Sequence, residues 1–148
     1  MTYTKEKSTI FNLNANIVAG SIYLLTIVFG KIPYGKFLLP IIPIVIYFVE
    51  KKSDLVKFHA MQNFLLDILL LVINGVLMLI GVDGIANVMD FVSKNTGDLF
   101  TILVILTYFL IIVLFIMVIQ SLIAMVFAFM NKKRKIVFIG ELAEKIIK

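Results

Sequence analysis

Four long apolar runs, separated by short polar or charged stretches, dominate the chain. A helix needs about 20 apolar residues to cross a bilayer, so each run is a candidate membrane span. The expected spans are residues 10–30, 34–50, 60–80 and 99–130. The last run is longer than a bilayer requires, which indicates tilt or protrusion into the cytoplasm. We expect an all-α integral membrane protein: one domain, residues 1–148, with four transmembrane helices and a cytoplasmic tail, 131–148.

The second run allows two interpretations. It is short, and Pro40 and Pro43 remove backbone donors from it. Proline is tolerated in a membrane helix when neighbouring groups satisfy the freed carbonyls, which allows a kinked span. The run could instead form half of a re-entrant hairpin with the first run, which itself reaches span length only when it is extended back to Ile10.

Two further segments have the spacing of amphipathic interfacial helices. Between the last two spans, the apolar residues at helical spacing are Ile85, Val88, Met89 and Val92. In the tail, the residues on one helical face are Ile136, Ile139, Ala143 and Ile146. The tail also places Glu141 before Lys145 and Glu144 before Lys148, which is the favourable order for ion pairs between residues four apart.

Composition strengthens the membrane interpretation and excludes several kinds of site. The chain is 61% hydrophobic, whereas soluble domains are about 45–50% apolar. It has no Cys and one His, which excludes disulfides, iron–sulfur clusters, cysteine zinc sites and multi-histidine metal sites. Because the chain is so hydrophobic, its net charge of +5 points to binding at a membrane surface rather than to nucleic acid. We expect no metal and no cofactor.

Basic residues are distributed unevenly between the two sides that four spans would create. The side with both termini and the connector 50–57 carries eleven Lys and Arg residues, and the other side carries three. Because positive charge stays on the cytoplasmic side, we expect a multi-pass protein of the cell membrane with both termini in the cytoplasm. The basic residues expected at anionic lipid headgroups are Lys51, Lys52, Lys57, Lys132, Lys133, Arg134 and Lys135.

Polar residues form a stripe on the third span. His59, Asn63, Asp67 and Asn74 fall within roughly 80° of one helical face, with Gln62 at its edge. Gln120 in the fourth span is a candidate partner for this stripe. One interpretation is a pathway for protons, ions or a substrate, because charged residues inside a membrane face the bundle interior or water. The other is hydrogen bonding between helices that fixes their packing.

The first span carries a face of small residues, Ala15-x-x-x-Ala19 followed by Gly20, which permits close approach of another helix. Catalytic patterns are missing: the sequence shows no Ser/His/Asp set, no paired carboxylates and no phosphate-binding glycine loop. We expect that the chain is not an enzyme.

A seven-residue motif follows the charged connector: Val56, Lys57, Phe58, His59, Ala60, Met61 and Gln62. In this pattern, V-[RK]-F-H-A-x-Q, the chain resembles small bacterial four-helix membrane proteins of unknown function, which are similar in plan to the chloroplast import component Tic-twenty. The resemblance covers roughly residues 15–145, although the tail lacks the proline of the family's Y-x-[IV]-P segment. It implies a four-helix bundle with the motif on the cytoplasmic side, and a role in protein translocation or in holding partner membrane proteins.

Three functions agree with these features. The first is a scaffold or accessory of a membrane complex, acting through contacts with other membrane proteins or with itself. The second is an oligomeric channel or transporter-like conductor that uses the polar stripe, since four spans are too few for a repeat-built transporter. The third is immunity to a membrane-active peptide.

Overall fold

The computed structural model describes residues 6–30, 37–79 and 98–147, with side chains from residue 101 onward in the last part. The helices are α1 (Ala15–Phe29), α2 (Ile41–Val49), α3 (Asp54–Leu79), α5 (Asp98–Phe129) and α6 (Ile139–Ile147). Among the described residues, β pairing is limited to one isolated bridge between Lys7 and Asn14. The all-helical prediction is therefore confirmed. The short helix expected at 85–92 lies outside the described residues.

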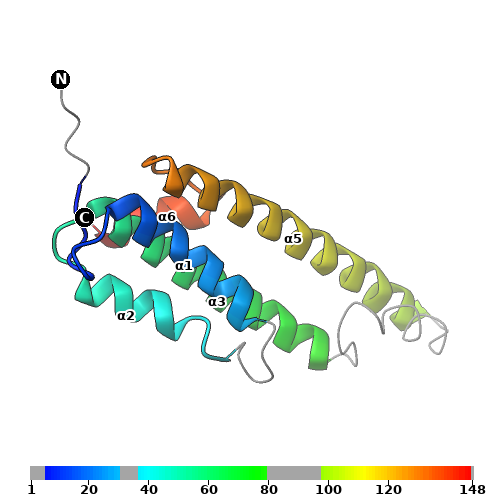
Figure 1. Cartoon of the computed structure of the whole chain (residues 1–148). Coiled ribbons are helices and arrows are strands. Elements are labelled where there is room, and N and C mark those ends of the chain that lie inside the picture. Colours follow the sequence, from blue (N-terminus) through cyan, green and yellow to red (C-terminus); the bar gives the residue numbers. More distant parts are fainter. Residues whose placement is uncertain (1–5, 31–36, 80–97, 148) are drawn as a thin grey trace.

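Helix α3 lies at the centre and contacts α1, α2, α5 and α6, while α1 also packs along α5 (Figure 1). The shared core includes apolar residues of α1, α3, α5 and the segment after α5: Ala19, Ile22, Tyr23, Val56, Leu66, Ala124 and Ile136. Both ends of the described chain lie near the start of α3. We call this end of the bundle, made of residues 6–14, 50–53 and 131–138, the basic end.

Two of the helices are long and apolar enough to cross a membrane. Helices α3 and α5 have 26 and 32 residues, or about 39 and 48 Å at 1.5 Å per residue. Helices α1 and α2 have 15 and 9 residues, about 22 and 14 Å, which is shorter than the hydrocarbon core of about 30 Å. A membrane crossing by four helices stays a prediction, as does the re-entrant alternative.

Helix α1 begins at Ala15 and not at Ile10, because a tight turn precedes it. The backbone N–H of Ser8 donates to the carbonyl of Leu13 over 2.9 Å. At the tip of this turn Phe11 and Asn12 have φ angles of 51° and 55°. These left-handed conformations cannot continue a right-handed helix, so the expected extension of the first span is wrong.

Helix α3 begins at Asp54, earlier than the expected start at residue 60. Ser53 caps it: its Oγ accepts a hydrogen bond from Val56 N–H over 3.3 Å, and its carbonyl accepts one from Lys57 N–H over 3.1 Å. The motif 56–62 therefore lies inside the first three turns of the helix. This position lets its residues contact neighbouring helices.

The small-residue face of α1 brings α1 and α5 together, as predicted. Ala15 and Ala19 are buried, as are Ala124 and Ala128 of α5. A Cβ added at Gly20 would lie 2.5 Å from ring atoms of Phe129, so the two helices are in contact there. The small residues of α1 therefore serve a contact between two helices of the same chain.

The predicted tail helix forms, and it packs on α3. Ile136, Ile139 and Ala143 of the expected face are buried, whereas Ile146 is exposed. Ala143 lies against Phe58 and Met61 in a small cluster. The ion pair that the structure shows here joins Glu144 to Lys135 over 2.6 Å; Lys148, the expected partner of Glu144, lies outside the described residues.

Candidate functional site

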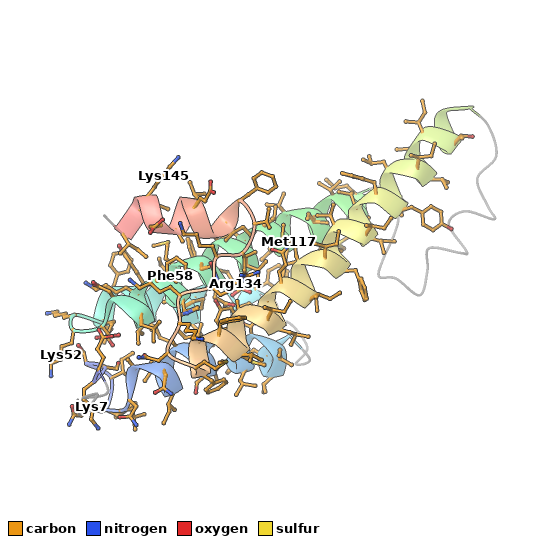
Figure 2. All side chains as sticks on the ribbon, turned by 90° about the horizontal axis from the view of Figure 1, so that it is seen from above. Lys7, Lys52, Phe58, Met117, Arg134 and Lys145 are labelled. Carbon is orange, nitrogen blue, oxygen red and sulfur yellow. The ribbon has the colours of Figure 1, made fainter. Side chains whose placement is uncertain are left out.

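Four residues of the predicted stripe lie buried on one face of α3: His59, Gln62, Asn63 and Asp67. They face α1 and the segment that leads from α5 to α6, residues 131–138, which we call the return segment. In Figure 2, Phe58 marks the start of α3 and Arg134 marks the return segment, which lies alongside it. Spacings of three and four residues place the four polar groups on this common side.

His59 joins α1 to the return segment. Its Nε2 lies 3.1 Å from the carbonyl oxygen of Lys132, and its Nδ1 lies 2.9 Å from the hydroxyl oxygen of Tyr23. Because a carbonyl only accepts, Nε2 carries the proton, and the Tyr23 hydroxyl donates to Nδ1. This order fits a neutral imidazole and uses both of its nitrogens.

Gln62 makes the largest number of contacts between α3 and the return segment. Its Nε2 donates to the Arg134 carbonyl over 3.1 Å and to the Tyr23 hydroxyl over 3.0 Å. Its Oε1 accepts from the backbone N–H of Ile136 over 3.0 Å. We call His59, Gln62, Tyr23 and their return-segment partners the clasp. The donor and the acceptor of each hydrogen bond in the clasp are determined, because backbone carbonyls can only accept and backbone N–H groups can only donate.

Asn63 and Asp67 form a second buried group, one helical turn deeper. The Asn63 amide donates to Thr26 Oγ1 over 2.8 Å and to Asp67 Oδ2 over 2.9 Å. The other side-chain oxygens, Asn63 Oδ1 and Asp67 Oδ1, are buried without a partner in the described part of the chain. Leaving such atoms unpaired costs about 1–3 kcal/mol each. A carboxylic acid proton on Asp67 Oδ1, donated to Asn63 Oδ1, would satisfy both with one bond.

Asn74 of the stripe and its candidate partner Gln120 are not brought to this site. Asn74 is exposed and donates to the Leu70 carbonyl of its own helix over 2.7 Å. Gln120 accepts from the backbone N–H of Val137 over 2.9 Å. The expected pairing of Gln120 with Asp67 or Asn74 is therefore wrong. Gln120 instead holds the return segment from the α5 side.

Glu50 is a buried charged residue that sequence patterns did not reveal. It is 1% exposed, and its carboxylate accepts hydrogen bonds from the Ser8 hydroxyl, from the Thr9 N–H and hydroxyl, and from the N–H groups of Lys52 and Ser53. Burial raises the pKa of Glu50, but these bonds outweigh burial and lower the pKa from 4.5 to about 2. Glu50 thereby fixes residues 8–9 to the connector before α3. Because two lysines follow it, Glu50 looks solvent-exposed in the sequence.

We expect Glu50→Gln to lower the free energy of unfolding at pH 7 by about 1.5–3 kcal/mol, because a charged acceptor is lost. The folded pKa is depressed, so the stabilisation is complete above the unfolded pKa of about 4.5 and is lost as the pH falls through about 2. Chemical unfolding in detergent from pH 7 to 2 measures this difference. Glu6→Gln, which changes an exposed carboxylate of the same segment, is the control. Equal stability of the Glu50 variant and the wild type at pH 7 would contradict the prediction.

The predicted headgroup-binding lysines and arginine all lie at the basic end or in the first turn of α3. Lys51, Lys52, Lys132 and Lys133 are exposed, and Lys57 is half-buried. Two others have partners: the Arg134 guanidinium lies 5.5 Å from the centre of the Phe127 ring, and Lys135 pairs with Glu144. The pairing with Glu144 raises the pKa of Lys135. Within the described ranges, no three His, Cys, Asp or Glu side chains are grouped to hold a metal ion.

Comparison with known proteins identifies one family. No curated protein and no solved structure matches the chain. Residues 14–143 match the family described as the magnetosome magnetite crystal formation protein family. This supports a small membrane-associated family, whereas the similarity to Tic-twenty stays a prediction. The match includes α1, α2, α3 and α5 and reaches into α6, so the chain belongs to the MamF/MmsF family.

Proposed function

We propose that this chain is a small integral membrane scaffold, an accessory that holds other membrane proteins or further copies of itself through contacts between helices. The family is described by magnetite crystal formation in magnetosomes, which agrees with an accessory role at a membrane. Protein translocation is one process that such a scaffold would serve. Conduction and immunity are the alternatives that the experiments below must separate from it.

The outward face of α5 is the observation that carries this proposal. Only 11% of the most apolar part of α5 is buried, against 33% for α3. The centre of this face is a stripe of residues that are 41–64% exposed: Ile105, Phe109, Ile112, Ile116, Ile119, Ile123 and Val126. Their spacing alternates between four and three residues, as in the contact seam of paired helices. We call these residues the α5 stripe.

The rest of the chain supports a rigid frame for this stripe. The clasp and Glu50 fix α1, α3, the connector and the return segment to one another by buried hydrogen bonds. Because both described termini and the basic residues gather at the basic end, the positive-inside rule favours a cytoplasmic location for that end. In this proposal the protein lies in the cell membrane with both termini in the cytoplasm, and α5 faces its partners.

Native mass measurement of the chain purified in mild detergent tests the proposal. We expect the wild type to carry a partner or a second copy at a fixed ratio. Three alanine substitutions in the α5 stripe, at Phe109, Ile112 and Ile116, should remove it. The control changes three exposed residues of α3 to alanine, namely Ile68, Val72 and Val76. A wild type that is monomeric and without partners, or equal loss in both triple variants, would overturn the scaffold.

The variant Asp67→Asn separates the scaffold from a conductor. The scaffold predicts that this variant keeps its partner, because Asp67 is buried away from the α5 stripe. A conductor predicts a pH-dependent flux in liposomes that Asp67→Asn abolishes. Flux in the wild type that disappears in the variant would favour conduction.

A further inference from the structure

An apolar groove lies at the basic end, between the N-terminal turn and the last two turns of α2. It has a volume of about 400 Å³ and is lined by Thr9, Ile10, Phe11, Val45, Ile46 and Val49. Thr9 is its one polar lining residue. The neighbouring face of α2 is also apolar and exposed, with Phe48 72% exposed.

The N-terminal turn holds Phe11 at this groove. Its backbone groups bond to one another, from Leu13 N–H to the Ile10 carbonyl and from Ala15 N–H to the Glu6 carbonyl. Phe11 has a left-handed backbone, which is strained for a bulky residue, and its side chain is 89% exposed. The turn therefore offers a large apolar ring and few free backbone groups. Such a surface suits an acyl chain better than an extended peptide, which needs backbone partners.

Lysines lie at the polar end of the groove. Thr9 Oγ1 accepts a hydrogen bond from the backbone N–H of Lys51 over 3.0 Å, so residues 51–52 lie beside the groove's one polar residue. Figure 2 shows Lys7 and Lys52 at the same edge of the molecule. None of these three lysines makes an ion pair with a described residue.

Glu50 makes no ion pair with these lysines among the described contacts, although it lies next to them in sequence. Both of its carboxylate oxygens accept hydrogen bonds from Ser8, Thr9 and the backbone of residues 52–53. Its charge is buried beneath the turn. The positive charge of Lys51 and Lys52 therefore remains available to an outside anion.

We propose that this groove binds one anionic glycerophospholipid, with an acyl chain along Ile10, Phe11 and Val45 and the phosphate at Lys51 and Lys52. The charge of the lysines complements the headgroup, and the apolar lining matches the chain. A site of this kind would hold a lipid of the leaflet at the basic end against the N-terminal turn. It extends the proposed scaffold but does not depend on it, because it involves no residue of the α5 stripe.

Native mass spectrometry of the full chain, with dioleoyl phosphatidylglycerol or dioleoyl phosphatidylcholine added, tests the site. We expect one phosphatidylglycerol to bind at least about tenfold more tightly than phosphatidylcholine, since each lysine near an anionic headgroup adds to the affinity. The double variant Lys51→Gln/Lys52→Gln should remove this preference. The variant Lys145→Gln, which changes an exposed lysine of α6 away from the groove, should keep it.

Filling the groove tests the acyl chain. Val45→Trp should weaken phosphatidylglycerol binding about tenfold, whereas Val126→Trp on the outer face of α5 should not. Val45→Ser, which adds a polar group without bulk, repeats the test if the tryptophan prevents folding. Equal binding of the two lipids, equal loss in both lysine variants, or unchanged binding in both Val45 variants would overturn the site. Glycerol phosphate without chains should bind much more weakly, and binding as tight as the lipid would also overturn it.

Discussion

Replacing Gln62 by alanine is expected to release the return segment from α3 and to lower the free energy of unfolding by about 3–5 kcal/mol. The substitution removes three hydrogen bonds at once, to Tyr23, to the Arg134 carbonyl and to the Ile136 N–H. The Ile136 N–H is buried and would have no other partner in the clasp. An unsatisfied buried donor costs more than the bond contributed, so the loss is large.

Trypsin cleavage within residues 132–135 measures the release, and thermal unfolding in detergent measures the stability. Gln120→Ala is the matched control, because Gln120 also bonds to the return segment, at the Val137 N–H, but in an exposed position. We expect the control to cost less than about 1 kcal/mol. If the two variants were cleaved at the same rate, the clasp would not be what holds the segment.

Gly140→Ala should disturb the same contact without removing a hydrogen-bonding group. A Cβ at Gly140 would lie 2.6 Å from the Lys135 Cα and 2.8 Å from Gln62 Oε1. The Lys135 backbone cannot move away without displacing the return segment, so faster cleavage is expected here too. Gly75→Ala is the control: a Cβ there meets nothing within 4 Å, and the change should stabilise α3 by about 0.5–1 kcal/mol.

The sequence predicts most of the helical architecture because long apolar runs have few alternatives in a membrane. It places α5 within one residue at each end and identifies the small-residue face of α1. It does not predict the start of α1, because the left-handed turn at Phe11 and Asn12 has no glycine to signal it. The lengths of α1 and α2 cannot be predicted from the sequence either, since hydropathy does not show where a helix ends.

The sequence predicts only part of the candidate site, and the reason is physical. Helical periodicity places His59, Asn63 and Asp67 on one face. That face is expected to be buried, because exposing polar side chains to lipid costs free energy. The partners of these residues cannot be deduced this way. His59 and Gln62 bond to backbone carbonyls of the return segment, and Glu50 pairs with residues 41 and 42 positions away. Such contacts depend on how the helices pack, which the pattern along the chain does not specify.

Asp67→Asn and Asp67→Leu are expected to have very different effects, because we expect Asp67 and Asn63 to form an acid–amide pair. In that pair the Asn63 amide donates to Asp67 Oδ2, as observed, and a protonated Asp67 Oδ1 donates back to Asn63 Oδ1. An amide in place of the acid keeps both bonds, so Asp67→Asn should change the free energy of unfolding by less than about 1 kcal/mol. Leucine keeps neither bond and leaves Asn63 Oδ1 and one N–H of the Asn63 amide unpaired, while the amide keeps its bond to Thr26, so Asp67→Leu should cost about 2–4 kcal/mol.

Unfolding in detergent gives these energies, and infrared spectroscopy identifies the proton. The wild type should show the carbonyl band of a protonated carboxylic acid that Asp67→Asn removes. Asn74→Leu is the control, because Asn74 is exposed and bonds only within its own helix, so it should have little effect. If Asp67→Asn cost as much as Asp67→Leu, the acid–amide pair would be wrong. Asp67 would then be ionised, and its unpaired oxygen would need a partner from outside the chain, as conduction through the membrane requires and a scaffold does not.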